Sequence, residues 1–168
     1  MSATILIPPP ARSTLSREIN SRINTLESQI ELHATVNADK RRIFDALTLP
    51  EYMEAWLCLP CNHSNCHTTA SQTGSCFRFD HFVDGMLDLT ITGSYRICRR
   101  SKMCFSWRKN SAIRRPESSP ETHVLIRLDG AFASSNVRVS HTGFFSKDEY
   151  SWHRGMWQMS LKKLQSLF

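Results

Sequence analysis

The sequence has 168 residues, a length typical of a single domain, and 40% of them are hydrophobic while 21% are charged. This composition excludes a disordered or low-complexity protein, and no apolar run approaches the roughly 18–20 residues needed to span a bilayer. The formal net charge is +6. The short apolar stretch at residues 5–7 lacks the basic flank of a signal peptide, so we expect a cytoplasmic protein without a membrane anchor.

We expect residues 1–28 to form an N-terminal extension of one domain that covers residues 29–168. Residues 1–12 are rich in proline, whereas residues 13–27 carry apolar side chains at a helical spacing. The extension is therefore predicted to be partly disordered, with a short amphipathic helix that packs on the domain or on a partner.

A strand and two short helices are predicted next. From Ile30 to Val36 every second residue is apolar, which is the pattern of a strand with one buried face. We expect a first helix to start near Asp39 and a second at Pro50, because Asp favours a helix start and Pro suits the first helical turn. Residues 58–73 are polar and are predicted to form a loop.

From Gly74 onward the apolar residues alternate almost throughout, which predicts five further strands. Asp84-Gly85 is a strong hairpin signal, and Gly93 is expected to mark a bulge or a bend. Six strands joined mostly by sequential hairpins indicate an antiparallel sheet with one apolar face. The residues expected on that inward face are Phe77, Phe79, His81, Val83, Leu87, Leu89, Ile91, Tyr95, Ile97, Met103, Phe105, Trp107, Val124, Ile126, Leu128, Val137, Val139 and His141.

Residues 148–168 return to a helical spacing, with an apolar stripe wide enough to lie across a sheet. The stripe and the residues that widen it are His153, Trp157, Leu161, Leu164 and Phe168, with Trp152, Met156 and Met159. We expect Trp157, Leu161 and Leu164 to be buried against the inward face. The residues expected opposite them are Leu89, Phe105 and Val139. One helix over a strongly curved sheet is expected to leave a cavity, closed at one end by the two short helices.

Several short stretches, taken in order, carry a family resemblance. They are Ala38–Thr48, Pro50–Leu57, Gly74 with Phe77–Phe79, Phe105–Trp107, His141–Phe144, and Trp157 with Leu161 and Leu164. Together they resemble the helix-grip fold of the START and polyketide-cyclase superfamily, and within it the family named for the activator of the ninety-kDa heat-shock chaperone ATPase. The resemblance implies an α+β fold, in which a curved antiparallel sheet of about six strands wraps a long C-terminal helix and two short helices follow the first strand.

The inward face supplies candidates for a ligand site. A cavity lined by aromatic side chains with a few polar groups is the usual form of a small-molecule pocket. We therefore predict a non-catalytic domain that binds a hydrophobic small molecule or a lipid between the sheet and the C-terminal helix. The residues expected nearest to this ligand are Trp56, Phe79, His81, Tyr95, Trp107, His141 and Trp152.

Catalysis has little support in the sequence. A general base needs an orienting partner, yet Asp80, Asp84 and Asp88 are expected on the opposite face of the sheet or in the turn. No catalytic residue and no cofactor is predicted. Two alternatives follow from the resemblance: a co-chaperone-like activator of a heat-shock chaperone ATPase that acts through its surface, and a cyclase- or aromatase-like enzyme.

The positive charge is concentrated in one segment. Seven basic residues and no acidic residue lie between Arg99 and Arg115. Phe105 and Trp107 alternate inward, away from these charges, so we do not expect them to stack on nucleic acid. A basic rim is predicted instead, which fits an acidic protein surface such as that of a heat-shock chaperone. The rim residues are Arg99, Arg100, Lys102, Arg108 and Lys109. The oligomeric state is left open, a dimer included.

Cysteine and histidine gather in the 58–73 loop. Cys58 and Cys61 have the spacing of a zinc-chelating pair, and Cys66 and His63 are weak candidates to complete the site. No second pair of ordinary spacing is present, however. We therefore expect no bound metal and a loop with reduced thiols.

Overall fold

The computed structural model describes residues 29–57, 63–68, 72–111 and 120–168. The expected N-terminal extension and the Cys58–Cys61 pair lie outside these residues. In chain order the elements are β1 (Gln29–Val36), α2 (Lys40–Thr48), α3 (Pro50–Trp56), β2 (His63–Thr68), β3 (Cys76–Val83), β4 (Met86–Arg99), β5 (Lys102–Ser111), β6 (Thr122–Ala131), β7 (Ser134–Thr142) and α4 (Lys147–Ser166).

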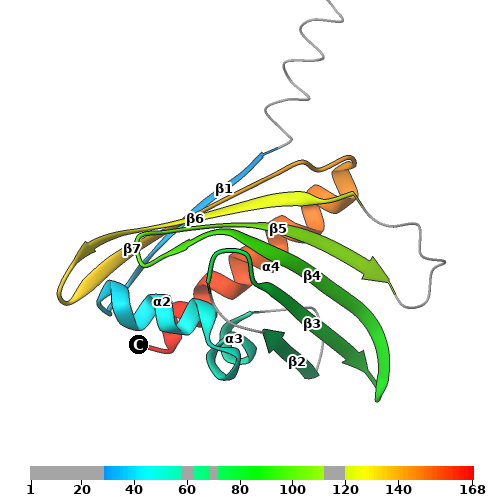
Figure 1. Ribbon diagram of the computed structural model, residues 1–168, viewed down its shortest axis with the longest axis horizontal. Coiled ribbons are helices and arrows are strands. Elements are labelled where there is room, and N and C mark those ends of the chain that lie inside the picture. The colour runs from blue at the N-terminus through cyan, green and yellow to red at the C-terminus, as the bar shows by residue number, and fades with distance from the viewer. Residues whose placement is uncertain (1–28, 58–62, 69–71, 112–119) are drawn as a thin grey trace, which may run out of the picture.

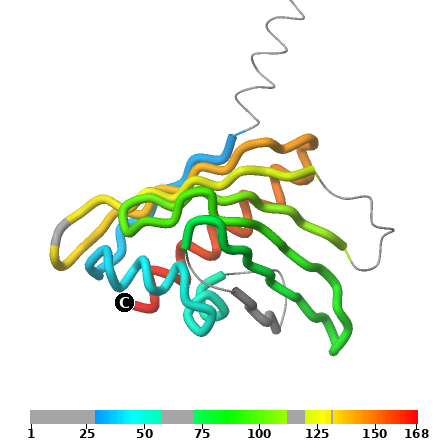
Figure 2. Tube along the Cα trace, viewed as in Figure 1, coloured from blue at the N-terminus to red at the C-terminus, as the bar shows by residue number. Residues whose placement is uncertain are grey.

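The strands form one antiparallel sheet in the order β1-β7-β6-β5-β4-β3-β2. The sheet curves, and α4 lies across one of its faces (Figure 1). Figure 2 shows that β1, the first strand in the chain, lies beside β7, the last. This arrangement is the helix-grip fold that the family resemblance implied. Within the described residues, no helix is long and apolar enough to cross a membrane.

The described sheet has seven strands, one more than expected. The additional strand β2 lies inside the predicted loop and pairs with β3, from His63 opposite Phe82 to Thr68 opposite Phe77. Its sequence, His-Ser-Asn-Cys-His-Thr, has no apolar alternation. A strand at a sheet edge is held by main-chain bonds to a single neighbour, so this strand gave no hydrophobic pattern to detect.

The helix starts follow from local capping chemistry. The Asp39 carboxylate accepts a hydrogen bond from the backbone N–H of Arg42 at 2.9 Å, and Pro50 occupies the first turn of α3, as predicted. Ser146 caps α4, where its hydroxyl oxygen accepts from the N–H of Glu149 at 3.2 Å. Each cap satisfies an N–H group that has no partner within its helix.

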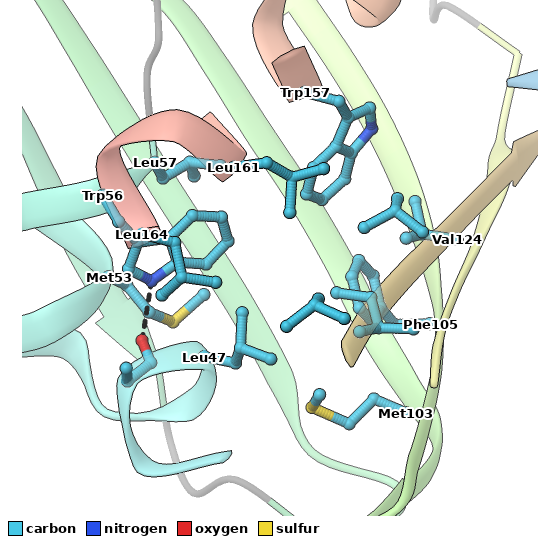
Figure 3. Close-up of a cluster of buried hydrophobic side chains, with 14 of the residues drawn as sticks. Leu47, Met53, Trp56, Leu57, Met103, Phe105, Val124, Trp157, Leu161 and Leu164 are labelled. Carbon is cyan, nitrogen blue, oxygen red and sulfur yellow. Dashed lines mark hydrogen bonds between the residues drawn. The ribbon is translucent and has the colours of Figure 1, made fainter. Parts of the chain in front are cut away.

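The core lies between α4 and the concave face of the sheet (Figure 3). The expectation for this core is confirmed, because all six residues named for it are buried. They are Trp157, Leu161, Leu164, Leu89, Phe105 and Val139. Three expectations about inward-facing side chains were wrong. Ile97 lies on the outer face, because an irregularity after Tyr95 pairs it with Cys104, which stands between the buried Met103 and Phe105. Met159 is 53% exposed, because it sits two positions and about 200° around the helix from Trp157. Val83 is 39% exposed, because a bulge between His81 and Phe82 shifts the register before it.

Gly93 lies near the middle of β4. The irregularity of β4 falls between Tyr95 and Ile97, slightly beyond the glycine at which we expected it. Gly93 itself pairs with Phe77. A Cβ atom at Gly93 would overlap the carbonyl oxygen of Ser106 and the ring of Phe77. The glycine is therefore required by the close approach of an aromatic ring to the backbone.

Candidate ligand site beneath the C-terminal helix

A small apolar space lies between the two short helices, α4 and the sheet. Its volume is about 10 Å³, roughly that of one water-sized probe. The residues that line it are Leu47, Met53, Trp56, Leu57, Phe77, Phe79, Tyr95, Phe105, Trp107, Ile126 and Trp157. Four of the seven predicted ligand residues are among them: Trp56, Phe79, Tyr95 and Trp107. His81 and His141 are buried elsewhere in the interior, and Trp152 is half-buried on α4.

Aromatic rings form a continuous cluster around this space. Phe77 lies at its centre, with ring centroids 5.4 Å from Tyr95, 5.5 Å from Phe105 and 6.1 Å from Trp107. Trp107 in turn lies 5.7 Å from Trp157. The cluster therefore joins β3, β4 and β5 to α4 through ring contacts, which supply much of the burial energy of a core.

His141 is fully engaged in a chain of hydrogen bonds. The indole N–H of Trp157 donates to His141 Nδ1 at 3.0 Å, so this nitrogen carries a lone pair. His141 Nε2–H then donates to the hydroxyl of Thr122 at 2.7 Å, and that hydroxyl donates to the carbonyl of Trp107 at 2.9 Å. Burial lowers the pKa of His141 to about 2, helped by the nearby His153 and His123. His141 is therefore a neutral side chain with both ring nitrogens occupied.

His153 is engaged at one nitrogen. Its Nδ1–H donates to the backbone carbonyl of Glu149, one helical turn earlier, at 2.7 Å. The carboxylate of Glu149 lies 3.4 Å from the same nitrogen. Burial is the main cause that lowers the pKa of His153 to about 4, although both the carbonyl and the carboxylate of Glu149 oppose it. The remaining nitrogen, Nε2, is then an acceptor inside the core.

Two buried polar atoms near this histidine lack a hydrogen-bond partner. They are the donor Trp107 Nε1 and the acceptor His153 Nε2, neither of which has a partner among the described residues. Trp107 is 2% exposed and His153 1% exposed, and their ring centroids are 6.4 Å apart. Each unmade bond costs about 1–3 kcal/mol. A hydroxyl group can accept from one atom and donate to the other.

A cluster of charged side chains lies beside His153, at what we call the polar end of the interior, which contains His141 and His153. Lys109 pairs with Ile91 in the sheet and so faces inward, contrary to the expected outer rim. Its ammonium lies 2.7 Å from the carboxylate of Glu149 and 4.4 Å above the ring centroid of Trp152. These contacts bridge β5 and the first turns of α4. They place a partly exposed ion pair and a cation–π contact beside buried His153.

The other rim residues do not gather at one place. Arg99, Arg100 and Lys102 flank the β4–β5 turn, whereas Arg108 lies near the opposite end of β5. The guanidinium of Arg108 lies 3.8 Å from the carboxylate of Glu121. The basic segment is thus continuous in sequence but divided between the two ends of a strand.

His81 has a carboxylate closer than the sequence indicated. We expected Asp88 on the opposite face, but its oxygen lies 3.9 Å from Nε2 of the fully buried His81. The cause is a bulge in the pairing of β3 with β4. His81 pairs with Leu89 and Phe82 pairs with Leu87, which leaves Asp88 between them without a paired residue. An extra residue in one strand re-aims its side chain, which simple alternation cannot anticipate.

Metal binding remains untested by these observations. Among the described residues, no group of three or more His, Cys, Asp or Glu side chains could hold a metal ion. Cys58 and Cys61 lie outside these residues, while Cys66 and His63 contribute backbone to β2. The absence of a bound metal stays a prediction.

Sequence reasoning missed part of this site. The apolar pattern places His153 on the buried stripe of the helix. Glu149 stands four residues before it, a spacing that brings two side chains together on a helix. That signal could have found the pair. Thr122 gave no signal, because its contact with His141 depends on the register of β6 against β7.

A family model covers most of this domain. Residues 37–168 match the model of the Activator of Hsp90 ATPase homolog 1-like proteins. The chain belongs to this family. Among curated protein sequences, none matches the chain significantly.

Solved structures with the same fold are distant in sequence. CV1439 from Chromobacterium violaceum is 19% identical with a TM-score of 0.65, over 83% of this chain and 96% of that one. The Aha1 dimer from Colwellia psychrerythraea is also 19% identical, with a TM-score of 0.59, over 82% and 93%. DynU16, from the dynemicin biosynthetic locus, is 18% identical with a TM-score of 0.64; the match covers 83% of this chain but only 46% of DynU16. At these identities the likeness shows the fold alone.

Proposed function

We propose that this family member is a non-catalytic domain that binds a mainly apolar small molecule bearing one hydroxyl group, beneath α4. The observation that carries the proposal is the pair of unpartnered atoms, Trp107 Nε1 and His153 Nε2, beside a space lined by aromatic rings. A ligand hydroxyl would satisfy both atoms, while its apolar body would contact the rings. This combination suits recognition of one orientation of a hydrophobic ligand.

The same geometry argues for binding rather than catalysis. His141 has no free ring nitrogen. His153 has an orienting group in Glu149 and a free Nε2, which are features of a general base. A pKa of about 4, however, makes it a poor proton acceptor at neutral pH. A neutral acceptor of hydrogen bonds is the better description of His153, so the cyclase-like alternative is the least favoured.

A second candidate function is surface action of the kind that the family name describes, as an activator of a chaperone ATPase. It is favoured by the size of the internal space, which at about 10 Å³ is too small for a ligand without rearrangement. The two functions differ in what they need from the interior. The first requires the space to enlarge, whereas the second requires only a stable scaffold.

Matched aromatic probes test the proposed ligand site. We expect naphthol to raise the melting temperature more than naphthalene, because a ligand that binds only the folded state stabilises it and only naphthol carries the hydroxyl. Trp107→Phe should abolish this preference. Trp56→Phe is the matched control, since the Trp56 indole already donates to the carbonyl of Ala46 at 2.7 Å, and it should keep the preference.

The outcome separates the two candidates. If neither those probes nor a wider panel of lipids and sterols shifts the melting temperature or quenches tryptophan fluorescence, the ligand proposal fails. A pull-down with a heat-shock chaperone at low and high salt then tests surface action, since salt screens exposed charge contacts. Native mass spectrometry of the protein from its own cells would report a retained ligand, a bound metal and the subunit count. Fractionation of those cells would test the expected cytoplasmic location.

A further inference from the structure

Basic side chains from five strands line up in one row across the sheet. Arg99 pairs with Lys102, Lys102 with Arg127, Arg127 with Arg138, and Arg138 with His33. Paired residues of antiparallel strands lie on the same face. The neighbouring row, Met103–Ile126–Val139, is buried, so the basic row lies on the outer face of the sheet. The sequence hides this row, because its members come from separate segments.

The row is poorly neutralised. Among the described residues, Arg138 has one acidic neighbour, Asp129, at 3.9 Å, and both side chains are more than 60% exposed. For Arg99, Lys102 and Arg127 the described residues supply no ion pair. Like charges placed directly opposite one another destabilise a sheet. A bound anion would therefore reduce the repulsion between the paired cations of this row.

A half-buried apolar row runs beside the basic one on the same outer face. Ile97 pairs with Cys104 and Cys104 pairs with Leu125. All three side chains are partly buried, so each keeps some surface exposed to solvent. The outer face thus presents cations and apolar groups in adjacent parallel lines, each crossing several strands that are about 4.8 Å apart.

We propose that this outer face docks an extended segment of a partner protein in which acidic and apolar side chains alternate. The acidic side chains would meet Lys102, Arg127 and Arg138, and the apolar ones the Ile97–Cys104–Leu125 row. An open hollow of about 460 Å³ at the β1–β7 end of the basic row, lined by His33 and Arg138 among others, offers room at that end. This surface is independent of the ligand site, which lies on the other face of the sheet.

The apolar row favours a protein segment over nucleic acid. Phosphates would meet the cations but leave Ile97 and Leu125 without a partner. Single strands also stack their bases on aromatic side chains, and neither of the two rows contains Phe, Tyr or Trp. A polypeptide can satisfy both rows at once.

The test uses fluorescently labelled peptides and the full-length protein. We expect a short peptide of alternating Glu and Leu to bind more tightly than an oligo-Glu peptide, and the latter more tightly than an oligothymidylate of equal charge. Binding should weaken as salt is added. The double variant K102E/R127E should raise the dissociation constant about tenfold or more, since each reversal replaces an attraction with a repulsion. Leu125→Asn should weaken the Glu-Leu peptide but not oligo-Glu.

Matched controls keep the result interpretable. K162E/K163E makes the same change in net charge on the exposed side of α4 and should leave the dissociation constant within about twofold. If K102E/R127E does not fold, as judged by its melting curve, Arg127→Gln replaces it. Absence of saturable binding at low salt, an equal loss in the α4 control, or tighter binding of the oligothymidylate would each overturn the proposal.

Discussion

The two ends of the interior beneath α4 are built on different principles. Near α2 and α3 the side chains are apolar, such as Leu47 and Met53, and the indole N–H of Trp56 finds a backbone carbonyl. Near the first turns of α4, His141 and His153 are packed among aromatic rings. Apolar packing tolerates approximate fit, whereas a buried polar group must find its partner. The difference implies that the first end provides stability and the second provides selectivity.

The largest expected effect comes from Trp157, which belongs to both ends. It stacks near Trp56, with ring centroids 6.4 Å apart, and donates to His141. Trp157→Ala should lower the free energy of unfolding by about 3–5 kcal/mol, the usual cost for a buried large aromatic. Urea denaturation measures it. A loss below about 1 kcal/mol would contradict the central position of this ring.

Acid should weaken the polar end specifically. The pKa of His153 falls to about 4 and that of His141 to about 2, from an ordinary value of 6.5. Below about pH 6.5 the unfolded chain therefore binds protons that the folded chain does not. Stability should be complete above pH 6.5 and decline as the pH falls, with the His153 part ending near pH 4 and the His141 part near pH 2. Each pKa unit of difference is worth about 1.4 kcal/mol.

Substitution assigns this slope to its source. His153→Gln should flatten the dependence of unfolding free energy on pH between about 6.5 and 4. Equal slopes in wild type and His153→Gln would show that His153 is not held neutral.

Two matched tryptophan variants compare a used N–H with an unused one. Trp157→Phe leaves His141 Nδ1 without its donor, whereas Trp107→Phe removes an N–H that has no partner among the described residues. Both lose similar volume. We expect Trp157→Phe to cost about 1–3 kcal/mol more than Trp107→Phe in urea denaturation. Equal costs would mean that the Trp107 N–H has a partner after all.

The smallest effect is expected at the surface of the polar end. Lys109→Met removes the ion pair with Glu149 and the cation–π contact with Trp152. Because these groups are partly exposed, the loss should be about 1 kcal/mol or less, and it should shrink at high salt. Thermal melts at two salt concentrations measure it. A loss that does not change with salt would point to packing of the lysine stem instead.

The apolar end was predictable from sequence because periodicity reports burial directly. Trp157, Leu161 and Leu164 recur at a helical spacing, and Phe77 and Phe79 at a strand spacing, and all are buried. The polar end was not predictable, because its contacts depend on strand register and on bulges. Asp88 reached His81 through one unpaired residue.

The outer face was hidden for a related reason. Lys102 and Lys109 both belong to the basic segment, yet they lie on opposite faces of β5. A charge run in the sequence therefore does not define a charged surface, whereas the register of five strands does.

Close packing at Gly93 bears on which side of the internal space can move. The ring of Phe77 and the carbonyl oxygen of Ser106 both lie so close to Gly93 that not even a Cβ atom would fit there. Because this part of the sheet is already in close contact, we expect any enlargement of the space to come from the side of α3 and α4. A bound ligand would then displace α3 and α4 away from the sheet. Ligand binding should therefore change amide hydrogen exchange in α3 and α4 more than in β3 and β4.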